Sequence, residues 1–122
     1  MVTQAQLSLQ LASVEWQGLE SLLQHLRKQF PDQIQQVILF GSKARNDSEP
    51  GSDTDLLVLV KDETWALRHA IWKLVSRVEL EHGDLLFNVQ VISVERWQVM
   101  TRAGFSLCQN VAREGIALYK TV

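Results

Sequence analysis

The chain has 122 residues, of which 46% are hydrophobic and 21% are charged, and its formal net charge at pH 7 is −2. Its size and composition predict a single globular domain over residues 1–122, and the acidic balance argues against a broad basic face that binds nucleic acid. No apolar stretch approaches the roughly 18 residues that cross a bilayer, and the N-terminus lacks the basic and apolar regions of a secretory signal. We therefore expect a cytoplasmic protein without a membrane segment.

In the first half of the chain, the spacing of apolar residues changes from helical to strand-like. Leucines recur at helical spacing up to Gln29, and Pro31 ends this pattern. The run "QVILF" stops at Gly41 and is typical of a short buried strand. The predicted elements are a helix at about 6–29, a strand at 36–40, a polar loop at 42–52 whose first turn (42–45) is helical, and a strand at 53–60.

The second half continues with one long helical pattern and one further strand. Apolar residues share one helix face up to Val78, Gly83 marks the exit, and Gly104 separates two later helical segments. The predicted elements are a helix at 63–81, a strand at 85–92 and helices at 94–101 and 106–119. This order predicts an α+β domain in which a small mixed β-sheet of about three strands is flanked by helices.

Two acidic residues stand at the start of the second predicted strand. Asp53 and Asp55 lead into the run "LLVLV". Because side chains alternate faces along a strand, both carboxylates point to one side, roughly 7 Å apart at about 3.3 Å per residue. Two such carboxylates repel each other unless a cation lies between them, and Mg²⁺ typically takes one or two carboxylates together with water and substrate phosphate. The pair predicts a Mg²⁺ site.

A phosphate site is predicted directly after the first strand. Gly41 has no Cβ and lets the backbone approach a ligand closely, while Ser42 presents its N–H and hydroxyl where a helical turn begins. Lys43 and Arg45 can add positive charge beside it. Each feature alone is commonly a turn or a solvated strand start. Together they are the parts that metal-assisted phosphoryl or nucleotidyl transfer needs.

The segment from Val37 to Val60 resembles a known family signature. It contains Gly41-Ser42, Ala44-Arg45 and the run "SDTDLLV" at 52–58. In these residues it is similar to the DNA polymerase β-like nucleotidyltransferase superfamily, and more narrowly to the small prokaryotic minimal nucleotidyltransferases (MNT). The tail "NVAREGIALY" at 110–119 also resembles the end of many such proteins. The resemblance implies the polymerase β-like nucleotidyltransferase fold.

The resemblance also implies roles for individual residues. Gly41 and Ser42 would hold the triphosphate of ATP or another NTP, with Arg45 as a further phosphate contact, and Asp53 and Asp55 would bind the Mg²⁺ that bridges to it. An acceptor hydroxyl would then attack the α-phosphate, and pyrophosphate would leave. Small MNT proteins are often paired with a HEPN-domain toxin and can transfer AMP to its tyrosine, which implies a toxin–antitoxin pair.

The third predicted strand departs from the family pattern. The family supplies a third acid from this strand, and by position we expect it at Gln90, with Asn88 on the same face. Neither side chain can act as a base, and a neutral amide is a poorer Mg²⁺ ligand than a carboxylate. Asp84 is acidic but is interpreted as a turn residue. The alternative function is therefore a catalytically weakened module that binds nucleotide or a partner.

Other reactive side chains are interpreted as structural. We expect surface or helix-end positions for the histidines, a packing role for Cys108, and a solvated or structural pair for Arg113 and Glu114. Most of the four tryptophans should be core, although Trp65 and Trp72 lie partly beside the main apolar stripe of their helix and one of them could face a partner. The histidines are His25, His69 and His82.

Several questions stay open at the level of the sequence. Transfer to a small molecule, as in aminoglycoside nucleotidyltransferases, would need a further domain or a dimer to build the acceptor pocket. Action on nucleic acid fits poorly with the acidic net charge. The residues do not specify the base, the acceptor or the oligomeric state, and a homo-oligomer is compatible with them.

Overall fold

The computed structural model describes residues 11, 13–47, 52–83 and 85–120. Its centre is a four-stranded sheet in the order β3-β2-β1-β4. The strands are β1 (Ile34–Phe40), β2 (Thr54–Val60), β3 (Phe87–Ser93) and β4 (Ile116–Lys120). β1 is antiparallel to both β2 and β4, whereas β2 and β3 are parallel. The α+β class with a mixed sheet is confirmed, with one strand more than the expected three.

The additional strand lies where the sequence predicted the end of a helix. α6 (Ser106–Glu114) ends at Gly115, so the predicted helix over 106–119 is wrong beyond Glu114. In the following segment Ile116 and Leu118 are buried while Ala117 is exposed, which is the alternation of a strand with one covered face. Pairing with β1 satisfies the backbone of this segment and overrides its helical continuation.

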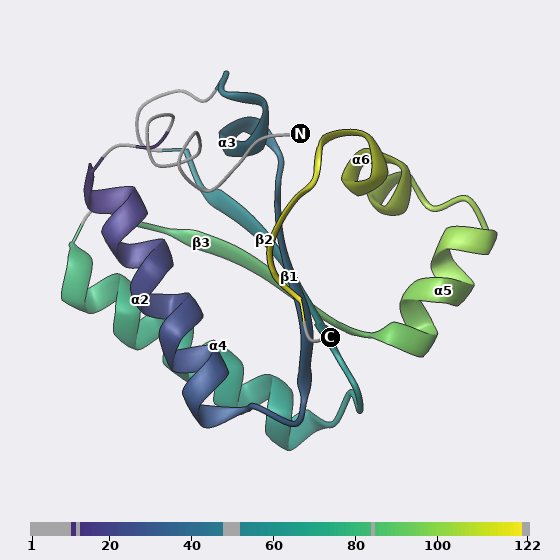
Figure 1. Cartoon of the computed structure of the whole chain (residues 1–122), viewed down its shortest axis with the longest axis horizontal. Coiled ribbons are helices and arrows are strands. Elements are labelled where there is room, and N and C mark those ends of the chain that lie inside the picture. The colour runs from purple at the N-terminus through teal and green to yellow at the C-terminus, as the bar shows by residue number, and fades with distance from the viewer. Residues whose placement is uncertain (1–10, 12, 48–51, 84, 121–122) are drawn as a thin grey trace.

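Helices cover the two faces of the sheet (Figure 1). α2 (Ser13–Gln29) and α4 (Trp65–His82) pack on one face, and α5 (Val94–Arg102) and α6 lie over the other. The short α3 (Ser42–Arg45) sits at one end of the sheet. Most of the predicted helix over 6–29 is confirmed by α2, and its first part, 6–10 and 12, lies outside the described residues. No described helix is both long and apolar enough to cross a bilayer.

The period-two alternation of β2 divides the core into two clusters. Leu56, Val58 and Val60 pack with α2 and α4, and Leu57 and Leu59 pack with α5 and α6. Asp55 shares the face of Leu57 and Leu59, because side chains two residues apart point to the same side. At the start of β2, the Asp55 carboxylate therefore lies on the face of the sheet that α5 and α6 cover.

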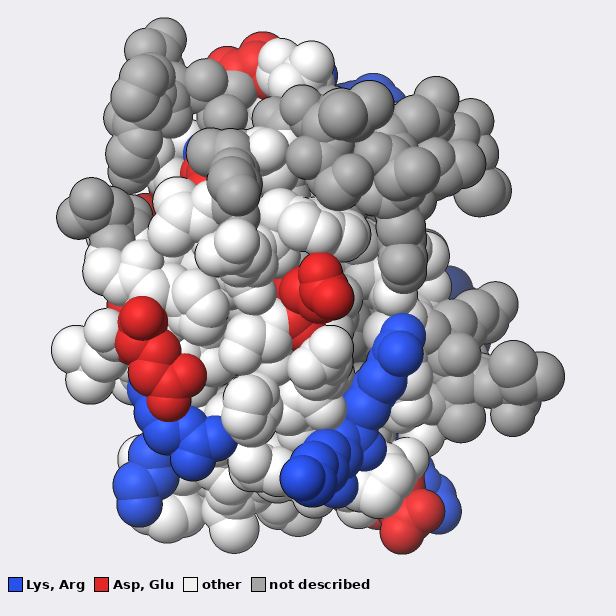
Figure 2. Space-filling model, turned by 60° about the vertical axis from the view of Figure 1, so that its left-hand side comes forward, with Lys and Arg blue, Asp and Glu red and all other residues white. Residues whose placement is uncertain are grey.

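The tryptophans differ partly from expectation, whereas His69 is exposed as expected. Trp16 and Trp97 are half-buried against the two clusters, but Trp65 and Trp72 are 75% and 44% exposed, so two of the four lie outside the core. His69 stacks between these two exposed rings at centroid distances of 3.9 and 5.7 Å. The packing role of Cys108 is confirmed by its burial. On the side that Figure 2 shows, basic side chains lie mainly in the lower half beside acidic ones and form no continuous positive surface among the described residues.

Candidate active site

The strand pairing brings the predicted site residues to one end of the sheet. Phe40, the last residue of β1, pairs with Asp55 at the start of β2, and Asp55 pairs in turn with Asn88 near the start of β3. On the other side of β1, Leu39 pairs with Ile116 at the start of β4. The end of β1 and the starts of the other three strands therefore meet where the chain leaves β1 at Gly41.

The two predicted carboxylates lie at the solvent boundary. Asp53 is exposed and Asp55 is half-buried, while Thr54 between them is only 2% exposed. The Thr54 N–H donates to the Leu86 carbonyl at 2.9 Å, which fixes the start of β2 beside the segment that enters β3. This alternation agrees with the expectation that Asp53 and Asp55 point to the same side of the chain.

Gly41 packs directly on the carboxylate of Asp55. Its backbone has φ 77° and ψ −158°, a conformation that is essentially restricted to glycine. A Cβ at this position would lie 2.2 Å from Oδ2 of Asp55. The sequence indicated that Gly41 permits a close approach to phosphate. The structure shows that the same missing side chain also lets the turn approach the predicted metal ligand.

The register of β3 places Asn88, and not Gln90, beside Asp55. Asn88 pairs with Asp55 and its Nδ2 donates to Asp55 Oδ1 at 2.9 Å, whereas Gln90 pairs with Leu57, two residues further along. Both amides are on the expected face, and Asn88 is the one that contacts Asp55; that Gln90 occupies the third-acid position stays a prediction. The conclusion about chemistry is unchanged, because Asn88 is also neutral and cannot act as a base.

The two cations of the loop have different surroundings. Lys43 is 4% exposed and forms an ion pair with Glu15 of α2, so its ammonium joins two helices and does not add charge at the surface of the predicted phosphate site. Arg45 has a side chain that is 45% exposed and donates to Asp47 Oδ2 and to Glu114 Oε2, both at 3.0 Å. These hydrogen bonds to the carboxylates of Asp47 and Glu114 raise the pKa of Arg45 above its ordinary value.

Glu114 is a site residue that sequence reasoning missed. Its Oε1 accepts the Gly41 N–H at 2.9 Å while Oε2 accepts Arg45 Nη1, and its side chain is 9% exposed. Desolvation by burial acts to raise the pKa of Glu114, but the hydrogen bonds from Arg45 and the Gly41 N–H outweigh it and the pKa is lowered. Arg113 instead donates to Asn110 Oδ1 at 2.8 Å. The tail motif around Glu114 was the only sequence signal.

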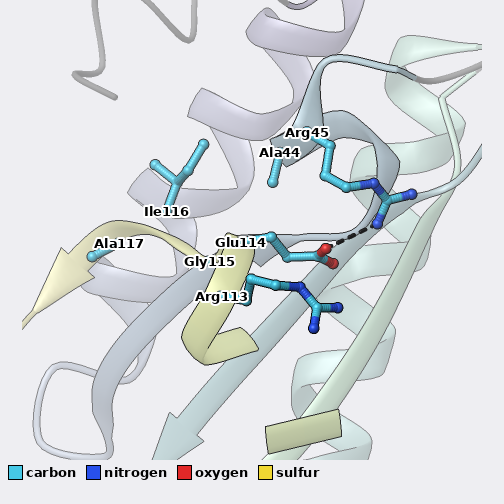
Figure 3. A pocket seen from close by; sticks show the side chains of 7 residues that line it. All are labelled: Ala44, Arg45, Arg113, Glu114, Gly115, Ile116 and Ala117. Carbon is cyan, nitrogen blue, oxygen red and sulfur yellow. Dashed lines mark hydrogen bonds and ion pairs between the residues drawn. The ribbon is translucent and has the colours of Figure 1, made fainter. Parts of the chain in front are cut away.

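A cavity of about 570 Å³ lies beside this carboxylate (Figure 3). Arg45 from α3 and Glu114 from the end of α6 point toward each other across it, and Arg113 lies next to them. The lining residues are Ala44, Arg45, Arg113, Glu114, Gly115, Ile116 and Ala117. The cavity is on the β4 side of α3, whereas Asp55 and Asn88 are on the β2–β3 side.

The carboxylates at the start of β2 fit a magnesium ion. The exposed Asp53 carboxylate and the half-buried Asp55 carboxylate supply oxygen ligands, which is the one-or-two-carboxylate set that Mg²⁺ takes when phosphate and water complete its shell. No group of three or more His, Cys, Asp or Glu among the described residues could hold a metal. The site therefore matches an ion that depends on its substrate for part of its ligands.

Comparison with known proteins identifies the family. Residues 19–118 match the nucleotidyltransferase domain, over 100 of 122 positions. The chain belongs to the nucleotidyltransferase domain family. The family match extends well beyond the Val37–Val60 signature and includes the tail that carries Glu114, so the resemblance seen in the sequence is confirmed.

Individual nucleotidyltransferase relatives agree with this assignment. A Methanocaldococcus jannaschii protein that bears the provisional name of protein adenylyltransferase is 43% identical over 56 residues, which cover 45% of this chain and 57% of that protein. A crystal structure of a toxin–antitoxin with AMP-PNP superposes with a TM-score of 0.55 at 25% identity, over 86% of this chain and 73% of that one. A provisionally named nucleotidyltransferase from Sulfolobus solfataricus has a TM-score of 0.57 at 19% identity, over 98% and 90% of the chains, and shows the shared fold.

Proposed function

We propose that the chain is a Mg²⁺-dependent nucleotidyltransferase that moves AMP from ATP to a hydroxyl group, most specifically to a tyrosine of a partner protein. The observation that carries the proposal is the contact between the Gly41–Ser42 turn and the Asp55 carboxylate, where a Cβ on Gly41 would lie 2.2 Å from Oδ2. Any residue with a Cβ would collide with the carboxylate here, so only glycine lets the turn approach it this closely. The proposed domain boundary is the whole chain, residues 1–122.

In this proposal, Gly41, Ser42 and Arg45 bind the triphosphate, and Asp53 and Asp55 hold the ion. Bound Mg²⁺ would neutralise negative charge on the phosphates and stabilise the entering and leaving oxygens. The acceptor oxygen forms a bond to the α-phosphorus, the bond from that phosphorus to the α–β bridging oxygen breaks, and the electron pair leaves with pyrophosphate. Packing against Gly41 and the hydrogen bond from Asn88 Nδ2 orient the Asp55 carboxylate.

The attacking hydroxyl must lose its proton, and β3 provides no general base beside Asp55 to accept it. Asn88 occupies the position in register with Asp55, and its amide cannot take a proton. The proton must therefore leave to water or to a carboxylate that accompanies the acceptor. This requirement favours an acceptor delivered on a protein surface, which can carry its own acidic group, over a small alcohol.

Two of the similar proteins support the adenine nucleotide and the protein partner. The M. jannaschii relative is provisionally named a protein adenylyltransferase, and the structure at 25% identity is a toxin–antitoxin complex with AMP-PNP. We extend these names to the present chain as a proposal, with a HEPN-domain toxin as the partner. Because the match spans 57% of the M. jannaschii protein's length, that protein's whole activity is not carried over.

A second candidate function rests on Asn88. Its amide donates to the same Asp55 carboxylate that would hold the ion, so the chain could bind Mg²⁺-nucleotide or a partner with weak turnover. The two candidate functions differ in whether inhibition of the partner requires the Asp53 and Asp55 carboxylates. If the chain inhibits its partner by transfer of AMP, the Asp53→Asn/Asp55→Asn double variant should abolish inhibition. If it inhibits by occlusion, the double variant should still inhibit.

Mass spectrometry of the partner tests the proposal. The proposed HEPN-domain partner, sought as the product of the neighbouring gene, is co-expressed with the wild-type chain and, separately, with the double aspartate variant, and each partner is digested. The proposal predicts a peptide with AMP on a tyrosine in the first sample and its absence from the second. An unmodified partner that is nevertheless inhibited by both chains would support the binding module instead.

A further inference from the structure

The side chain of Glu114 joins two groups that the proposed function assigns to phosphate binding. Oε1 accepts the backbone N–H of Gly41 at 2.9 Å and Oε2 accepts Nη1 of Arg45 at 3.0 Å. One carboxylate thus uses both oxygens on two parts of the same loop, 73 and 69 residues away in the sequence. A surface ion pair would not do this, because its partners would be free to separate into solvent.

The sheet brings Glu114 to this place. Leu39 of β1 pairs with Ile116 of β4 in an antiparallel ladder, and continuation of the same register by two residues sets Gly41 opposite Glu114. Gly115 makes the approach sterically feasible, since a Cβ there would lie 2.5 Å from the Val111 carbonyl oxygen and 2.9 Å from Ile38 Cγ2. The end of α6 is therefore pressed against β1 at the level of the phosphate loop.

The carboxylate restrains two features that would otherwise vary. Gly41 has φ 77° and ψ −158°, and glycine leaves such a peptide free to rotate unless its N–H is held. Arg45 is long and 45% exposed, and its other partner, Asp47, is exposed as well, so the mostly buried Glu114 carboxylate is the firmer restraint. Arginine loses less rotamer freedom on binding when its planar fork is already oriented. Glu114 is itself 9% exposed, so its own position is fixed by packing.

We propose that Glu114 is a positioning residue of the nucleotide site, which holds the Gly41 peptide and the Arg45 guanidinium in the arrangement that receives the triphosphate. This inference rests on the proposed function and adds a part to it: the C-terminal segment completes a phosphate loop that lies near the middle of the chain. Glu114 touches no substrate in this scheme. It acts through the two groups that do.

An inhibitory role for Glu114 would show the same two hydrogen bonds in the structure. A carboxylate that occupies an N–H and a guanidinium can also compete with an incoming phosphate for these donors. The two roles differ in sign. Removal of the charge weakens nucleotide binding if Glu114 positions the donors and strengthens it if Glu114 competes for them.

Calorimetric titration with Mg²⁺-ATP separates these roles, and the chain offers a matched control. Glu63 also bridges a backbone N–H and arginine side chains at the far end of β3. It accepts the Ser93 N–H at 2.9 Å and Arg96 Nη1 at 3.0 Å, and it also accepts Arg68 Nη2 at 2.5 Å. Glu63→Gln is therefore expected to lose at least as much stability as Glu114→Gln. Glu114→Gln should bind Mg²⁺-ATP about tenfold more weakly, corresponding to about 1.4 kcal/mol, and Glu63→Gln should bind it like the wild type.

Two further variants tell whether the effect passes through Arg45. Glu114→Asp keeps the charge but withdraws it by one methylene, so it should also weaken binding although it is the least disruptive change. In an Arg45→Ala background, Glu114→Gln should have a clearly smaller effect than in the wild type, because the side chain it positions is already gone. Fully additive losses in this cycle would overturn the action through Arg45.

The remaining outcomes are also decisive. Unchanged or tighter Mg²⁺-ATP binding by Glu114→Gln, with normal binding by the wild type, would overturn the positioning role and leave the proposed function standing. Equal weakening by Glu63→Gln would mean that general destabilisation, and not position, causes the loss. Wild-type protein that binds no Mg²⁺-ATP would overturn the proposed function together with this inference.

Discussion

Replacement of Gly41 by alanine tests the contact on which the proposed site depends. The added Cβ would lie 2.2 Å from Asp55 Oδ2 and 3.0 Å from its carboxylate carbon, well inside van der Waals contact. The neighbour is the carboxylate that we assign to the metal, so it cannot move aside without leaving its place in the site. The backbone would also have to keep φ 77° with a Cβ present.

The expected cost has two parts. A non-glycine residue held in such a backbone region costs about 1–3 kcal/mol, and overpacking in a well-packed site costs about another 1–3 kcal/mol. Loss of glycine's unfolded-state entropy offsets about 0.4–1 kcal/mol of this. We therefore expect Gly41→Ala to lower the free energy of unfolding by roughly 2–5 kcal/mol.

Gly83→Ala is the matched control, measured by urea denaturation beside the wild type. Gly83 has φ 74° but nothing within 4 Å of an added Cβ, so it carries the backbone cost and the entropic offset without the collision. The difference between the two variants should be about 1–3 kcal/mol. Gly41→Ala should in addition bind no Mg²⁺-ATP, whereas Gly83→Ala should bind it normally.

Equal destabilisation by the two variants would refute this reasoning about the 2.2 Å contact. Retention of Mg²⁺-ATP binding by a folded Gly41→Ala variant would refute the assignment of the Gly41 turn to the phosphates. The two results are independent, since the first concerns the packing of Asp55 and the second concerns the ligand.

Three further predictions follow from named contacts. Asn88→Asp should raise Mg²⁺-dependent turnover more than Gln90→Asp does, because it places an acid in register with Asp55. Steady-state rates at saturating Mg²⁺ compare the two variants, and a larger gain from Gln90→Asp would contradict this reasoning from register. Lys43→Met removes one partner of a largely buried ion pair and should lower the unfolding free energy by about 3 kcal/mol in denaturant titrations, the low end of the usual range because the Glu15 side chain is 18% exposed. Burial acts to raise the pKa of Glu63, but hydrogen bonds from the Ser93 N–H and Arg96 outweigh it and lower the pKa. The Glu63 carboxylate therefore stabilises the fold above its unfolded-state pKa of 4.5, and this stabilisation is lost as the pH falls through its folded-state pKa. Unfolding free energies measured from about pH 6 to 3 should thus fall less steeply in Glu63→Gln.

The parts of the site that depend on local periodicity could be predicted from the sequence. Asp53, Thr54 and Asp55 alternate across the start of β2 because a strand repeats every two residues, and no distant contact is needed to see it. The Gly41–Ser42 turn is likewise local, because a glycine directly follows a short apolar strand and opens α3.

The parts that depend on pairing between distant segments could not be predicted. The face of Asn88 and Gln90 follows from alternation, but the choice between them is a matter of register, which α4 and its loops set. The contact of Glu114 with Gly41 requires β4, and that strand was interpreted as the end of a helix. Lys43 was expected to add positive charge beside the phosphate site, because its ion pair with Glu15 joins segments 28 residues apart and cannot be seen in the local sequence.

Label transfer from ATP carrying a radioactive α-phosphate tests the central claim most directly. The chain is incubated with Mg²⁺ and labelled ATP, with and without the product of the neighbouring gene, beside the Asp53→Asn/Asp55→Asn variant and a sample without Mg²⁺. The account predicts one labelled partner band that requires Mg²⁺ and disappears with the double variant. No labelled band from a wild-type chain that binds Mg²⁺-ATP and its partner would contradict transfer and leave a binding module.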